Sequence, residues 1–167
     1  MDLALKVTII TSVIGGLKWV YEYSNSNKWE RNKFLLEKIN EFESKEFITL
    51  VYKMLDWNSI TIDWNGQSYL INDNILVEAL KTHNIKQAFT RDETIIREIF
   101  DKYFDELNKL VVLSELKLVD KSGVESFIGY YLDILRGKRG KNKELVDTFK
   151  KYLKYYNYNK LSKFIYE

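Results

Sequence analysis

The chain of 167 residues carries a formal net charge of +2, and 46% of its residues are hydrophobic, which suits one folded domain of ordinary size. It contains no cysteine and one histidine, His83, so disulfides, thiolate metal sites and cysteine nucleophiles are excluded, and most histidine-based zinc and acid–base schemes lack their ligands. The absence of proline permits long uninterrupted helices, and an aromatic content of 15% supplies large side chains for their packing.

The first predicted element is an apolar segment over residues 3–23. Its uncharged centre, residues 7–17, would form about 16 Å of helix, too short for a hydrocarbon core of about 30 Å, whereas the whole segment reaches about 31 Å. Lys18, Trp19 and Tyr23 stand where snorkelling lysines and aromatic rings meet lipid headgroups. We therefore predict that residues 1–23 form a transmembrane helix or another membrane-anchor helix.

The flanking charges predict how this anchor is oriented. Lys28, Arg31 and Lys33 follow the segment and only Lys6 precedes its centre, so the positive-inside rule places residues 24–167 in the cytoplasm. A cleaved signal peptide fits poorly, because no basic region precedes the apolar run and no small-x-small site follows it. Two alternatives remain open: a helix buried in the core, and a helix lying in the membrane plane.

The remaining chain predicts a mainly α fold: a helical domain with one small β-hairpin, preceded by the N-terminal membrane-anchor helix. The hairpin is expected over residues 60–71. There apolar and polar residues alternate with the period of two that is typical of a strand, and Asn65-Gly66 is the favoured pair for a type I′ turn. Trp64 beside that turn is expected to pack back onto the domain rather than to bind a partner. The helices are expected over residues 29–54 (divided near Ser44), 73–85, 90–118, 124–135 and 145–156.

The longest helical pattern, residues 90–118, is expected to organise the fold. Thr90 and Glu93 can form a capping box at its start, and a broad stripe of branched and aromatic residues requires cover from other helices. Its opposite face, which includes Arg97, Glu98, Asp101 and Asp105, is interpreted as a solvated surface of paired charges.

Charge is distributed unevenly along the chain. From residue 134 onward there are ten Lys or Arg against three Asp or Glu, a local charge of +7, which leaves −5 for the first 133 residues. The basic C-terminal region, residues 136–163, is a candidate for contact with anionic lipid headgroups or, less favoured, with nucleic acid, and the plainest interpretation is a solvated basic face. The candidate contact residues are Arg136, Lys138, Arg139, Lys141, Lys143, Lys150, Lys151 and Lys154. Aromatic residues lie between these lysines, among them Tyr152, Tyr155, Tyr156, Tyr158 and Phe164.

No pattern in the sequence predicts a catalytic, cofactor-binding or metal-binding residue. There is no phosphate loop, dinucleotide fingerprint or nucleophile elbow. Asp56 and Asp63 flank the hairpin and could meet in space, but without a third ligand a cap or turn role is favoured. His83 is expected near the end of the helix over residues 73–85, where a partly protonated imidazole would complement the helix dipole. We therefore expect a protein that is not an enzyme.

Several short motifs resemble those of a known group. The similar elements are a K-W-x-R helix (Lys28, Trp29, Arg31), an M-L-D-W box (residues 54–57), an L-x-L-[VI] helix end (residues 116–119) and a G-Y-Y-L helix (residues 129–132). In these the chain resembles uncharacterised single-span bacterial membrane proteins, some of them loosely linked to phage abortive infection. The resemblance implies an anchor in the bacterial inner membrane and a helical fold, and it carries over no catalytic residue.

The leading hypothesis is therefore a non-enzymatic, membrane-tethered interaction module of a bacterium and a candidate effector of phage defence. The alternative is a soluble helical module that is oligomeric or binds nucleic acid through its basic, aromatic C-terminal region. The sequence identifies neither a protein partner nor an oligomeric state.

Overall fold

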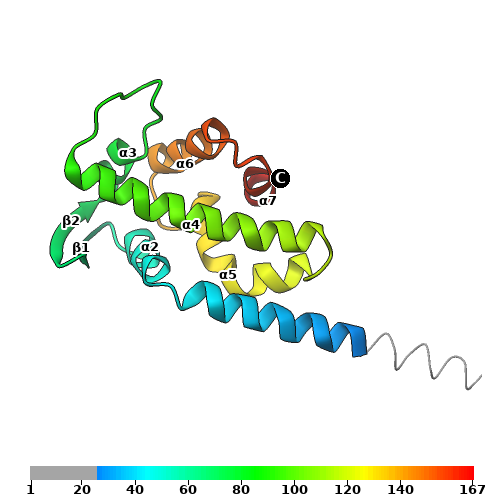
Figure 1. The fold of residues 1–167 in the computed structure, drawn as a ribbon. Coiled ribbons are helices and arrows are strands. Elements are labelled where there is room, and N and C mark those ends of the chain that lie inside the picture. Colours follow the sequence, from blue (N-terminus) through cyan, green and yellow to red (C-terminus); the bar gives the residue numbers. More distant parts are fainter. Residues whose placement is uncertain (1–25) are drawn as a thin grey trace, which may run out of the picture.

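The computed structural model describes residues 26–167, which fold into helices apart from one antiparallel hairpin (Figure 1). The leading helix is the name used here for residues 26–43, drawn in blue in Figure 1. The elements that follow are α2 (Glu46–Asp56), β1 (Ser59–Trp64), β2 (Gln67–Asn72), α3 (Asp73–Ala79), α4 (Arg91–Glu115), α5 (Lys121–Leu135), α6 (Lys143–Tyr155) and α7 (Asn159–Tyr166). The predicted mainly α class with one small hairpin is confirmed for these residues, and so is the break after Glu43 near Ser44.

Helix α4 lies at the centre of the fold and packs against α2, α3, α5 and α7. Its capping box is present as predicted: the Thr90 hydroxyl accepts from the Glu93 N–H at 3.3 Å, and the Glu93 carboxylate accepts from the Thr90 N–H at 2.9 Å. The helix buries a stripe that includes Phe100, Tyr103 and Phe104, which are fully enclosed. The aromatic content of the chain is thus concentrated in a core that α4 shares with every neighbouring helix.

The hairpin forms at the predicted place, with its turn at Asn65-Gly66. Asn65 and Gly66 both have positive φ, +51° and +76°, as a type I′ turn requires. Ile62 pairs with Tyr69 across the ladder and both face the core. Trp64 is also buried, so its ring packs onto the domain and does not form an exposed binding tip.

The helix predicted over residues 73–85 is shorter in the structure. Helix α3 begins with Asn72 as its cap, whose side chain accepts from the Ile75 N–H at 3.0 Å, but it ends at Ala79. Beyond it the Thr82 carbonyl accepts from the amides of residues 85 and 86, which makes a turn and not a further helical turn. His83 therefore does not lie at the C-terminus of this helix, and that part of the prediction is wrong.

Three helices end in the same backbone motif. At the ends of α4, α5 and α6 the residue after the C-cap has positive φ: Lys117 (+58°), Gly137 (+75°) and Asn157 (+62°). In each case the next amide donates back across the last turn, which defines a Schellman motif. The three bonds are Leu118 N–H to Leu113 O (3.0 Å), Lys138 N–H to Asp133 O (2.9 Å) and Tyr158 N–H to Leu153 O (2.9 Å).

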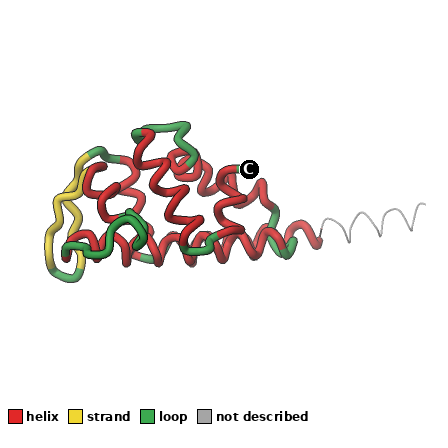
Figure 2. Tube along the Cα trace, turned by 90° about the horizontal axis from the view of Figure 1, so that it is seen from above, coloured by secondary structure: helices red, strands yellow, loops and turns green. Residues whose placement is uncertain are grey.

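The described residues are arranged lengthwise between two ends. Figures 1 and 2 place the hairpin at one end, and the start of the leading helix together with the turn between α4 and α5 at the other. The leading helix packs on the domain through one face, since Leu35, Ile39 and Phe42 are buried while Trp29 and Leu36 are exposed. Residue 26, where the predicted anchor joins the domain, thus lies at the end opposite the hairpin.

Candidate interaction surfaces

The predicted membrane-interface residues Lys18, Trp19 and Tyr23 lie outside the described residues. Within residues 26–167 no helix is both long enough and apolar enough to cross a bilayer. The candidate surfaces are therefore those that the folded domain presents, beginning with the eight basic residues predicted from the C-terminal region.

Arg136 is used inside the protein. Its guanidinium donates to the carbonyls of Ile165 (2.7 Å) and Phe164 (3.3 Å) and to the Glu125 carboxylate (3.1 Å). These two carbonyls belong to the last turn of α7, where backbone acceptors lack partners within the helix. Arg136 therefore fastens α7 to α5, and the prediction that it is free to meet a lipid or a nucleic acid is wrong.

Lys141 is also engaged internally. Its side chain is 0% exposed, and its ammonium donates to the Asp73 carboxylate at 2.6 Å and to the Trp57 carbonyl at 2.7 Å. It thereby ties the α5–α6 loop to the start of α3 and to the end of α2. The interpretation of residues 136–163 as a solvated basic face is therefore wrong at Lys141.

The other six predicted cations are exposed, but they do not form a single patch. Lys138 and Arg139 both approach Asp133, at 3.6 and 3.7 Å. Lys143 and Lys151 line a groove of about 550 Å³ beside α3 that also holds Glu144 and Asp147. The remaining two exposed cations, on α6, are Lys150 and Lys154. The basic face is therefore real on α6 and partly neutralised by neighbouring acids elsewhere.

The aromatic residues between these lysines mostly point inward. Tyr152 is buried, and its hydroxyl donates to Asp101 at 2.6 Å. Tyr158 donates to Asp105 at 2.7 Å, and Phe164 is buried. Of this aromatic set only Tyr155 is substantially exposed. Stacking of bases or rings at headgroup depth would need exposed faces, so the expectation for the C-terminal aromatics is wrong for all but this residue.

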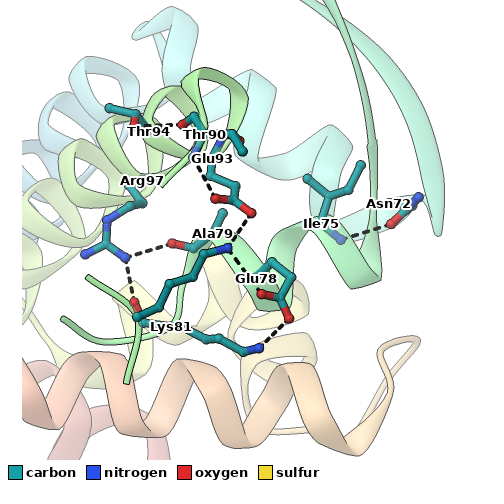
Figure 3. A network of polar contacts seen from close by, with 10 residues as sticks. Asn72, Ile75, Glu78, Ala79, Lys81, Thr90, Glu93, Thr94 and Arg97 are labelled. Carbon is teal, nitrogen blue, oxygen red and sulfur yellow. Dashed lines mark hydrogen bonds and ion pairs between the residues drawn. The ribbon is translucent and has the colours of Figure 1, made fainter. Parts of the chain in front are cut away.

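The sequence did not indicate the polar network around Arg97, which was assigned to the solvated face of α4. Arg97 is buried, and its guanidinium donates to the carbonyls of Ala79 and Lys81, both at 2.7 Å (Figure 3). It also donates to the Tyr156 hydroxyl at 2.6 Å. Its guanidinium also lies over the Phe89 ring at 4.2 Å. Arg97 thus supplies the positive charge at the C-terminal end of α3 that His83 was expected to supply.

His83 and Asp101 complete this network. The His83 ring contacts the Tyr156 hydroxyl and lies 3.4 Å from an Arg97 nitrogen. Burial raises the pKa of Asp101, against the hydrogen bond from Tyr152 and the charge of Arg97, which act to lower it. Although Arg, His, Tyr and Asp side chains meet here, the Arg97 donors end on two backbone carbonyls and the Tyr156 hydroxyl, so the arrangement holds α3, α4 and α6 together.

Two of the short motifs, residues 54–57 and 129–132, meet between α2 and α5. Tyr131 stacks on Tyr52 with ring centroids 3.4 Å apart, and its hydroxyl donates to Asp56 at 3.3 Å. Burial, followed by the Asp56 charge, raises the pKa of Tyr131 to about 12. The neighbouring aromatic residues Trp57 and Tyr130 are exposed.

We call Trp57, Tyr130 and Arg139 the aromatic patch, since Trp57 directly follows Asp56 and Tyr130 approaches the Asp56 carboxylate. Arg139 lies over the Tyr130 ring at 5.3 Å, and Tyr130 shares the Asp56 carboxylate with Tyr131. Trp, Tyr and Arg are the residue types that contribute most to binding energy at protein interfaces. The aromatic patch was not predicted as a site, although the M-L-D-W and G-Y-Y-L motifs contain two of its three members.

The two carboxylates that the sequence paired have separate partners. Asp63 accepts from the Ser68 hydroxyl across the hairpin, and Asp56 accepts from Tyr131. Among residues 26–167 no cluster of three His, Cys, Asp or Glu side chains is positioned to hold a metal ion.

Comparison of the chain with protein-family models, with curated proteins and with solved structures gave no match.

Proposed function

We propose that this protein is a non-enzymatic interaction module of a bacterium, tethered to the inner membrane through residues 1–23 with the helical domain in the cytoplasm. The observation that carries the proposal is a core that the described residues form among themselves. Each helix from α2 to α7 packs on another described element, and the leading helix is fixed through Phe42 on Tyr103 and Leu35 on Gly123. The apolar residues 3–23 are therefore not needed to cover a described buried face, which favours an anchor over a core helix.

The aromatic patch supports the second half of the proposal. Trp57 and Tyr130 expose large apolar rings on the helical domain, and Arg139 adds a cation that is always charged. Exposed aromatic residues beside an arginine suit a protein partner better than a small-molecule substrate, which would require a concave site. We propose that a cytoplasmic protein binds here.

Fractionation of the full chain tests the tether. Membranes are washed with high salt, alkaline carbonate and detergent in turn, and an inserted segment should be released by detergent alone. The variant Ile14→Lys places a charge at the centre of the segment, which costs about 2.5–3.5 kcal/mol on insertion scales, so it should move the protein to the soluble fraction. Leu36→Lys, on the exposed face of the leading helix, is the matched control and should stay with the membranes. A full-length chain found in the soluble fraction would refute the tether.

Phage defence is proposed on the resemblance of the motifs alone, and plating efficiency measures it directly. Cells that express the full chain should reduce phage plating, and both Ile14→Lys and Trp57→Ala should abolish the reduction. Leu70→Ala, which removes an equally exposed residue from the hairpin, should retain it. Equal plating with and without the protein would remove the defence role but leave the tether intact.

The soluble, nucleic-acid-binding module is the second candidate, favoured by the exposed lysines of α6. Lys150, Lys151 and Lys154 lie on one exposed stretch of that helix. Binding through them would fall steeply as salt is raised, because each neutralised phosphate releases counterions. The inward-facing Tyr152 and Tyr158 speak against this candidate, since they leave few rings for base stacking.

A further inference from the structure

The turn between α4 and α5 exposes two leucines that the fold could have buried. Leu116 and Leu118 are 64% and 47% exposed, although the residues on either side of the turn, Val111 and Val119, are buried. Between the leucines Lys117 holds a positive φ of +58°, which fixes the turn in shape. The result is a short rigid projection with an apolar, a basic and an apolar residue in sequence.

This projection lies at the end of the domain where the predicted anchor joins it. Figure 1 shows the α4–α5 turn at the end of the domain where the leading helix begins, and the Arg31–Asp120 ion pair, 3.8 Å long, connects the two. Arg31 is eight residues beyond Tyr23, the last residue of the predicted anchor, which corresponds to about 12 Å of helix. The headgroup layer of one leaflet is about 5–8 Å thick, so the proposed tether would hold the projection close to the membrane surface.

Charge around the projection favours anionic lipid. Lys117 lies between the leucines, Lys121 follows them, and both residues are exposed. Of the nearby acids, Glu115 pairs with Lys160 at 2.7 Å and Asp120 pairs with Arg31, while Glu167 lines a pocket together with Lys121 and Lys163. Phosphate groups of lipids would therefore meet unbalanced positive charge here, while the two leucines enter the boundary between headgroups and acyl chains.

We propose that the α4–α5 turn is a second membrane contact, in which Leu116 and Leu118 insert at the headgroup level and Lys117 and Lys121 bind anionic lipid phosphates. The proposal rests on the proposed tether, because residues 1–23 would hold the turn next to the bilayer. Its consequence is a fixed orientation: the hairpin and the aromatic patch face the cytoplasm, away from the membrane.

The absence of cysteine makes a direct test possible, because single cysteines can be introduced and labelled in the full chain. An environment-sensitive fluorophore is attached to Leu118→Cys, to Leu70→Cys on the hairpin as the matched exposed control, and to Val13→Cys within the anchor. The labelled proteins are reconstituted in phosphatidylcholine vesicles, with and without phosphatidylglycerol, and lipids carrying a spin label serve as quenchers. The inference expects quenching at positions 13 and 118 and none at position 70.

Quenching at position 13 without quenching at position 118 would overturn the second contact and leave the tether standing. No quenching at position 13 would overturn the tether and this inference with it. A blue shift at position 118 without quenching would mean that a protein surface covers the turn, which also overturns the inference.

Substitution of the two lysines tests their contribution to lipid binding quantitatively. Lys117→Gln and Lys121→Gln should each reduce the docked population at position 118 about fivefold in vesicles with phosphatidylglycerol, since one lysine at an anionic surface contributes about that factor. Lys102→Gln, far along α4 near the hairpin, should change nothing. Equal quenching for all three variants would refute the role of the lysines.

Discussion

Replacing Arg97 by methionine tests whether the buried guanidinium holds the end of α3. The change keeps a long side chain but removes the donors to the Ala79 and Lys81 carbonyls and to the Tyr156 hydroxyl. A hydrogen bond to a charged group contributes about 1.5–3 kcal/mol, and a buried acceptor left without a donor costs about 1–3 kcal/mol. We expect Arg97→Met to lower the free energy of unfolding by about 3–4 kcal/mol, which is large beside a total of about 5–15 kcal/mol.

Urea unfolding followed by circular dichroism measures this loss, and hydrogen exchange locates it. The amides of Leu80 and Ile85, which close the end of α3 and the turn after it, should exchange faster in Arg97→Met than in the parent. Lys109→Met is the matched control on the same helix: its exposed pair with Glu106 should be worth less than about 1 kcal/mol. Similar losses in the two variants would refute the structural role given to Arg97.

Three further predictions concern stability. Glu93→Gln should lower the free energy of unfolding by about 1–2 kcal/mol near neutral pH. Burial acts to raise the pKa of Glu93, but Lys86 and the cap N–H lower this pKa overall. The difference in stability between Glu93→Gln and the parent should therefore shrink as the pH falls below the ordinary value of 4.5, which unfolding measured at a series of acid pH values would show. Lys117→Gly should raise the free energy of unfolding by about 1 kcal/mol, because glycine holds positive φ without strain, and a lower urea midpoint would contradict this. Lys141→Met should lower the free energy of unfolding by about 3 kcal/mol, because it leaves the Asp73 carboxylate without its cation. Lys138→Met in the same loop is the control and should leave the thermal midpoint of unfolding almost unchanged.

Local signals in the sequence sufficed for the elements with strong periodicity or turn chemistry. The capping box at Thr90 and Glu93 and the turn at Asn65-Gly66 depend on residues next to one another, and both formed as predicted. The end of α3 did not follow from its own residues. It is fixed by Arg97, eighteen residues away from Ala79, and no pattern within the helix records that contact.

The same distinction separates the site residues that were predicted correctly from those that were not. A run such as RGKRGKNK gives the charge of each residue but not its neighbours in space. The charge pattern groups Lys141 with the exposed lysines, because its neighbours in the chain do not indicate its ion pair with Asp73, which lies sixty-eight positions earlier. The aromatic patch was missed for a related reason: Arg139 reaches Tyr130, and Lys141 reaches the Trp57 carbonyl, only when the loop after α5 folds over the end of α2.

The position of α7 sets an order of events during synthesis. Leu161 and Ile165 of this helix are buried against the core, and α7 packs on α4, so the core closes only after residue 165 has left the ribosome. Translation at about 5–20 residues per second needs roughly 7–30 s to pass from residue 23 to residue 165. During that time residues 3–23 are already outside the ribosome, while the domain behind them is still unfolded. Under the proposed tether, membrane delivery therefore precedes folding of the domain.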